Sequence, residues 1–193
     1  MRPETSGMVL SDRDSLMRKE EWNKAVDVVR REFAALPDIF PQKIGALAAA
    51  IKKQKRALYE MTISVEGEMV CELCKGGCCE TGAYHFTVVD LLVYLADGRE
   101  LFAPCFAGDR CPYLGHGGCM MGPEYRPFNC ITFHCEHLEK LLLDSEVDAF
   151  YAVEKLLRGH YSEMETLFGN TFAHGLLSNY ERSYPAKGTI LFA

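Results

Sequence analysis

Cys71-Glu-Leu-Cys-Lys-Gly-Gly-Cys-Cys79 places four cysteines within nine residues, and five more follow between Cys105 and Cys135. The remaining parts of the 193-residue chain contain no cysteine. A chain that concentrates its thiols in one segment generally uses them together, either as metal ligands or as disulfides. The choice between these two uses decides how the middle of the chain is held.

The cellular compartment favours metal ligation over disulfides. Met1 to Leu10 lead into a charged stretch without the apolar run of a secretory signal, so we expect a cytoplasmic protein. Reducing cytosol opposes a disulfide framework, and an odd number of cysteines would leave one thiol unpaired. We therefore expect a metal ion as the partner of these thiols.

Composition limits the other partners. The apolar stretches are short, which excludes a spanning helix and a membrane partner. A net charge of -6 provides no broad basic surface, so nucleic acid binding is disfavoured. We interpret the local basic cluster as the solvated face of a helix, formed by Lys52, Lys53, Lys55 and Arg56. The sequence identifies no protein partner.

Apolar periodicity predicts a mainly α fold. Residues 12–62 contain two helical patterns interrupted by Pro37 and Pro41, which predicts a helical hairpin. The first pattern places one apolar face on Trp22, Ala25, Val26, Val29 and Phe33. Residues 136–168 predict C-terminal helices with a break near Asp144, and the tail after Gly169 is weakly patterned.

The middle of the chain combines one short helix with a loop-rich stretch. Thr87-Val-Val-Asp90 is a capping-box signature for a helix that ends near Gly98. From Leu101 to Asn129, frequent Gly and Pro argue against regular structure. We expect a single domain, 1–193, in which a metal staples a cysteine subdomain, residues 71–135, to the helical body.

The thiol spacing supports ligation without selecting the metal. A C-x2-C turn lets Cys71 and Cys74 converge on one ion, with Cys78 following the flexible pair Gly76 and Gly77. Because Cys78 and Cys79 are adjacent, their side chains point in different directions, which indicates two ions or a multi-iron cluster. The spacing matches neither a zinc ribbon nor a ferredoxin run, so zinc, iron and an iron–sulfur cluster all remain open.

Cys71 to Cys79, followed by Cys111-Pro-Tyr-Leu114, Gly118-Cys119, Tyr125-Arg-Pro127, Cys130 and Phe133-His-Cys135, resembles the bacterial CxxCxxCC cysteine-cluster family, described as a zinc- or iron-chelating domain. The resemblance covers residues 71–135 and implies eight metal ligands: Cys71, Cys74, Cys78, Cys79, Cys111, Cys119, Cys130 and Cys135. Cys105 would be the spare thiol. This chain departs from the pattern with three residues instead of two between Cys74 and Cys78, and with Ile131 where an arginine commonly stands.

Flagellin lysine methylase contains a similar domain, so the alternative function is an iron–sulfur redox or methyl-transfer enzyme. The sequence has no nucleophile elbow, Walker loop or H-E-x-x-H motif, which leaves open whether the protein is an enzyme and identifies no catalytic residue.

Histidines and basic residues near the thiols are secondary candidates. We interpret His85, His116, His134 and His137 as surface or hydrogen-bonding residues, with His116 and His134 the first to consider if thiols alone do not supply the ligands. Charge compensation is expected from Lys75, Arg110 and Arg126, the last through a thiolate or a carbonyl.

Overall fold

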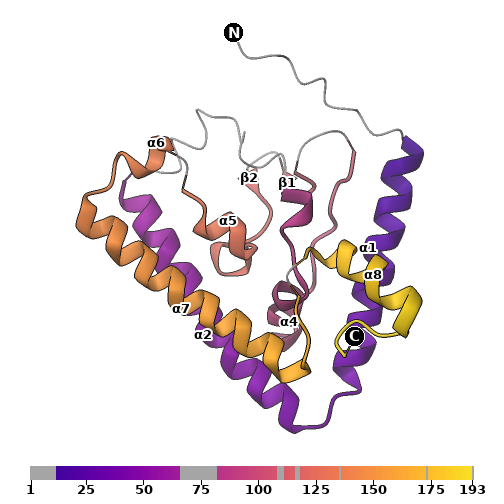
Figure 1. Ribbon diagram of the computed structural model, residues 1–193. Coiled ribbons are helices and arrows are strands. Elements are labelled where there is room, and N and C mark those ends of the chain that lie inside the picture. Colours follow the sequence, from indigo (N-terminus) through magenta and orange to yellow (C-terminus); the bar gives the residue numbers. More distant parts are fainter. Residues whose placement is uncertain are drawn as a thin grey trace.

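The computed structural model describes residues 12–65, 82–107, 111–115, 118–134, 136–172 and 174–192. The fold is mainly helical, as predicted (Figure 1). Helices α1 (Asp12–Ala34) and α2 (Ile39–Ser64) diverge from the turn at residues 35–38. The two predicted N-terminal helices are present, but they make few contacts with each other, and α2 pairs along its length with α7 (Asp144–Phe168).

Of the two prolines expected to interrupt the helices, Pro41 lies inside α2, which begins at Ile39, so that Pro41 is in its first turn. Proline is tolerated there because the first N–H groups of a helix have no intrahelical acceptor. Pro37 stays in the turn, where its carbonyl accepts the Phe40 N–H at 2.9 Å.

Helix α4 (Val88–Ala96) lies at the centre of the molecule and contacts α1, α2 and α7. Its first residues follow the predicted capping box: the Thr87 hydroxyl accepts the Asp90 N–H at 3.3 Å, and the Asp90 carboxylate accepts the Thr87 N–H at 2.9 Å. Every residue from Val88 to Tyr94 is buried. Gly98 closes the helix in the left-handed region, with φ of 60°.

Aromatic packing anchors much of the loop-rich stretch. The ring of Trp22, on the predicted apolar face of α1, lies 5.2–6.1 Å from four other aromatic rings, those of Phe86, Phe102, Phe106 and Tyr113. Such rings contribute large buried areas and favourable tilted or edge-to-face contacts. The described part of residues 101–113 is therefore held on α1 by side-chain packing.

The C-terminal part confirms the predicted break and adds an unpredicted helix. Helix α6 (Glu136–Glu139) is separated from α7, which ends at Gly169 with φ of 61°. Helix α8 (Leu176–Lys187) follows and packs on α1. The Glu32 carboxylate accepts the N–H groups of Ile190 and Leu191 at 2.9 and 2.7 Å, which ties the following segment to α1.

Only short elements occur between α4 and α6 in the described residues. Strands β1 (Leu114–Gly115) and β2 (Gly118–Cys119) pair in antiparallel register. They are followed by the 3-10 turn η3 (Pro123–Tyr125) and the short helix α5 (Phe128–Thr132). Another 3-10 turn, η2 (Gly82–Tyr84), precedes α4. No helix in the described parts of the chain has both the length and the apolar character needed to cross a bilayer.

Candidate metal centre

The structure describes three of the eight predicted ligands, Cys111, Cys119 and Cys130, and all three are free thiols. The other five lie outside the described residues: Cys71, Cys74, Cys78, Cys79 and Cys135. His116, Lys75 and Arg110 also lie outside them. Cys105, the predicted spare thiol, is described and exposed.

A small hairpin positions Cys111 and Cys119. The Leu114 N–H donates to the Cys111 carbonyl at 3.1 Å, and Leu114 pairs directly with Cys119 across β1 and β2. Tyr113, between the two cysteines in sequence, is buried in the aromatic core. The hairpin is thereby fixed to the helical body at one point.

Gly82, the first described residue after the Cys71–Cys79 segment, lies directly against Cys111. A Cβ atom at Gly82 would be 2.5 Å from the Cys111 Sγ, far inside van der Waals contact. Only glycine therefore allows this approach without a shift of the thiol. The first residue described after the segment with the first four cysteines is therefore in contact with a predicted ligand, Cys111.

Cys130 is brought to the same region by α5. Its Sγ lies 3.3 Å from the Nδ1 of His85, which follows η2. The Cys130 N–H donates to the Pro127 carbonyl at 3.0 Å, and the His85 N–H donates to the Gly82 carbonyl at 3.0 Å. Both members of the contact are thus held by backbone hydrogen bonds.

Cys111 and Cys119 contribute to the electrostatics of Cys130. Burial raises the pKa of the Cys130 thiol, and negative charge on Cys111 and Cys119 raises it further, although Cys130 is partly open to solvent. Burial also raises the pKa of Cys111, with a smaller contribution from Cys119. Such mutual effects require short separations. At neutral pH Cys111 and Cys130 are thiols, and a cation would have to displace their protons.

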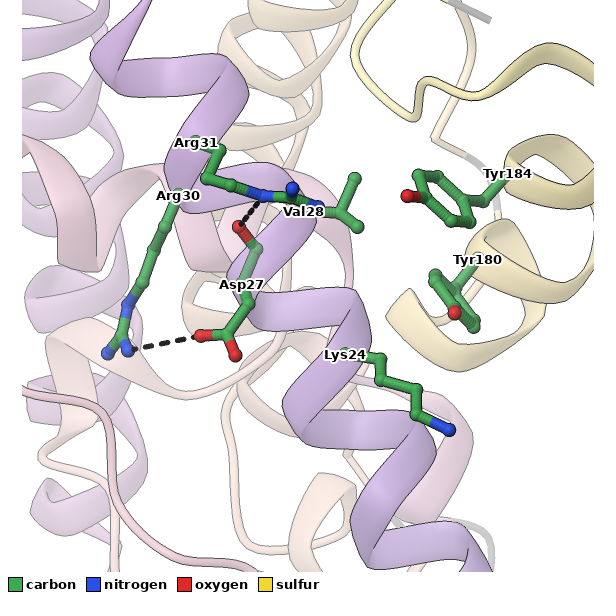
Figure 2. Close-up of a pocket in the computed structure, with 7 residues that line it drawn as sticks. All are labelled: Lys24, Asp27, Val28, Arg30, Arg31, Tyr180 and Tyr184. Carbon is green, nitrogen blue, oxygen red and sulfur yellow. Dashed lines mark hydrogen bonds and ion pairs between the residues drawn. The ribbon is translucent and has the colours of Figure 1, made fainter.

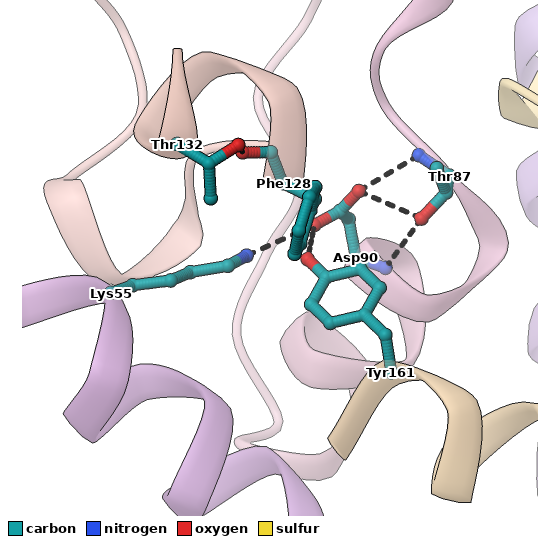
Figure 3. A network of polar contacts seen from close by, with 6 residues as sticks. All are labelled: Lys55, Thr87, Asp90, Phe128, Thr132 and Tyr161. Atoms are coloured by element: carbon teal, nitrogen blue, oxygen red, sulfur yellow. Dashed lines mark hydrogen bonds and ion pairs between the residues drawn. The ribbon is translucent and has the colours of Figure 1, made fainter. Parts of the chain in front are cut away.

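A buried ion pair lies beside this region (Figure 3). The Lys55 ammonium donates to the Asp90 carboxylate at 3.0 Å, and both side chains are completely inaccessible to solvent. Asp90 also accepts hydrogen bonds from the Tyr161 hydroxyl at 2.5 Å and the Thr87 hydroxyl at 2.8 Å. Asp90 raises the pKa of Cys130 and Lys55 lowers it, so the pair and the thiol are close enough to interact.

The interpretation of the basic cluster as a solvated face is wrong for Lys55 and incomplete for Lys52. Lys52 donates to both carboxylate oxygens of Asp97, at 2.7 and 2.5 Å, and the Tyr125 hydroxyl donates to the same carboxylate at 2.5 Å. Burial of Asp97 opposes ionisation, but these hydrogen bonds outweigh it and lower its pKa. From the sequence alone, a run of basic residues on a helix is interpreted as exposed, because the acidic residues that pair with it come from distant segments of the chain.

The other secondary candidates have ordinary structural contacts. The His134 Nε2 lies 3.1 Å from the Thr62 hydroxyl, and its ring lies 3.8 Å from that of Phe150. Burial lowers the pKa of His134 and also that of His85. Arg126 donates to the Met121 carbonyl at 3.4 Å, and the charge compensation expected of it stays a prediction. Sequence spacing therefore singled out His134, whereas the structure brings His85 to a thiol.

A separate groove of about 600 Å³ lies between α1 and α8 (Figure 2). The rings of Tyr180 and Tyr184 stack at 5.1 Å on one side, facing the basic and apolar side chains of α1. The groove contains none of the predicted ligands; its lining consists of Lys24, Asp27, Val28, Arg30, Arg31, Tyr180 and Tyr184.

Within the described ranges, no three His, Cys, Asp or Glu side chains converge closely enough to hold an ion by themselves. The described thiols could supply part of a ligand set, and their soft sulfur donors suit zinc and iron. Comparison with known proteins gives no match: no family model, curated protein or solved structure is significantly similar to this chain.

Proposed function

We propose that the protein binds zinc, iron or an iron–sulfur cluster through cysteine thiolates of residues 71–135. The observation that carries the proposal is the approach of two predicted ligands to the segment 82–85. The Cys111 Sγ lies directly against Gly82, and the Cys130 Sγ lies 3.3 Å from the Nδ1 of His85. These two thiols belong to different elements, the hairpin of β1 and β2 and the helix α5. Sequence proximity does not explain this arrangement, because 18 residues lie between Cys111 and Cys130.

Chain connectivity allows the remaining cysteines to join them. Cys79 precedes Gly82 by three residues, and three residues of chain span at most about 11 Å. Cys135 directly follows His134, whose position is fixed by Thr62 and Phe150. The chain at Cys79 can therefore reach the region of Cys111. Cys135 directly follows a residue that contacts α2 and α7.

The chemistry of the site favours a cation. Neighbouring thiols gain little from each other, since sulfur is a weak hydrogen-bond donor and acceptor. A divalent ion would displace their protons and bind the resulting thiolates as ligands. Each thiol that becomes a ligand would release one proton, so the number of protons released per ion measures the number of thiolate ligands.

Elemental analysis and an absorbance spectrum of anaerobically purified protein test the proposal. The critical variants are Cys74→Ser and Cys130→Ser, and the exposed Cys105→Ser is the matched control. We expect stoichiometric metal in the wild type and the control, and loss of metal in both critical variants. Colourless protein with zinc would indicate a metal-stapled binding protein, whereas iron with sulfide would favour the redox or methyl-transfer alternative. Wild-type protein without metal would refute the proposal.

A further inference from the structure

The contact between His85 and Cys130 has the dimensions of two ligands on one ion. For a tetrahedral zinc ion, Zn–S of about 2.3 Å and Zn–N of about 2.05 Å place sulfur and nitrogen roughly 3.5 Å apart. The observed separation of 3.3 Å between Sγ and Nδ1 matches this edge with a sulfur–metal–nitrogen angle of about 100° by the same bond lengths. An ion could bind both atoms with little movement of either side chain.

The two residues are also held firmly enough to act as ligands. His85 is followed by Phe86, which is completely buried in the aromatic core and accepts the Leu176 N–H at 2.6 Å. Cys130 is followed by Ile131, which is buried, in a helix turn anchored at Pro127. Rigid flanking residues hold the donor atoms in position before a metal arrives.

We infer that the Nδ1 of His85 coordinates the same metal ion as Cys130. This inference rests on the proposed metal binding and adds a ligand that the eight-cysteine pattern does not contain. On binding, the Cys130 thiol loses its proton to solvent, while His85 coordinates as a neutral imidazole and carries its proton on Nε2.

A histidine ligand changes the charge and the chemistry of the centre. Four thiolates on a divalent ion carry a net charge of about -2, and one imidazole in place of a thiolate reduces this to about -1. In an iron–sulfur cluster, histidine in place of cysteine raises the reduction potential. The inferred ligand therefore favours a less negative zinc centre or a cluster that is more easily reduced.

X-ray absorption of the zinc-loaded protein tests the inference directly, because it separates sulfur from imidazole scatterers. We expect imidazole in the wild-type shell, its loss in His85→Asn, and full retention in the control His160→Asn on α7. Competition titration with a chromogenic chelator should show zinc affinity falling by more than about 100-fold in His85→Asn, since even outer-sphere partners of ligands are worth roughly 10- to 100-fold.

A ligand exchange distinguishes coordination from a structural role. We expect His85→Cys to recover most of the affinity with a shell that gains sulfur and loses imidazole, and to release one more proton per zinc than the wild type. A wild-type shell of sulfur alone, with unchanged affinity in His85→Asn, would overturn this inference and leave the proposed function intact. Wild-type protein that binds neither zinc nor iron would overturn both.

Discussion

Replacing Lys55 with methionine would leave the Asp90 carboxylate buried without its cationic partner. The two side chains are completely inaccessible, so water cannot take the place of the ammonium. Asp90 would keep the hydrogen bonds from Tyr161 and from the N–H and hydroxyl of Thr87. The methionine side chain retains the length and the apolar stem of lysine, so the change mainly removes the charge.

Breaking a buried ion pair from one side costs about 3–5 kcal/mol of unfolding free energy. Because three donors remain on the carboxylate, we expect Lys55→Met to lie near the lower end, at about 3 kcal/mol. Asp90→Asn should cost more, since it leaves the ammonium facing the Tyr161 ring at 5.5 Å as its main remaining partner. The double variant Lys55→Met/Asp90→Asn should cost less than Asp90→Asn alone, because neither charge remains.

Urea denaturation at pH 7 measures these differences, with Lys53→Met at the exposed neighbouring position as the control. Thermal unfolding should show Lys55→Met lowering Tm by about 6–12 °C, from roughly 2–4 °C per kcal/mol in a chain of this size. The reasoning would be refuted if Lys55→Met costs less than about 1 kcal/mol, or if the two single changes add within about 0.5 kcal/mol in the double variant.

Three further outcomes are expected. Gly175→Ala would place a methyl carbon 2.5 Å from a backbone carbonyl oxygen of η2, so we expect a loss of about 1–3 kcal/mol in urea denaturation, and an unchanged midpoint would contradict this packing. The pKa of Asp97 is lowered in the folded state, so its contribution to stability is present above its unfolded value and is lost as pH falls through the folded value. The stability advantage of wild type over Asp97→Asn should therefore be constant near neutral pH and shrink below about pH 4, as followed by unfolding at a series of pH values. Chelation of bound metal should increase hydrogen exchange at residues 111–115 and 118–119 while the buried helix α4 stays protected by the core, and equal deprotection of both would contradict a core that holds without metal.

Features that depend on neighbours in sequence were predictable from the sequence. The capping box of Thr87 and Asp90 specifies the start of α4, because each residue satisfies a backbone group only three positions away. The apolar face around Trp22 follows from helical spacing in the same way. The pairing of the long helices was not predictable, since periodicity identifies a buried face without naming the element that covers it.

Helix α8 was missed because distant contacts hold it. Its first N–H, that of Leu176, donates to the Phe86 carbonyl, and the segment after it is tied to Glu32 on α1. Its sequence carries Pro185 and a weak apolar pattern, so local propensity alone does not favour a helix. Tertiary contacts therefore stabilise what the local sequence leaves undecided.

The same distinction explains what sequence spacing could say about the candidate site. Cysteine clustering predicts the residue type of the ligands, and that stays a prediction; the position of Cys111 against Gly82 depends on the fold and not on a regular spacing. His85 lies 45 residues from Cys130 and has no motif around it, so only the fold brings their side chains together. The anchors on either side of this contact are aromatic or apolar residues. The rigid body that positions these donor atoms is thus built by hydrophobic packing.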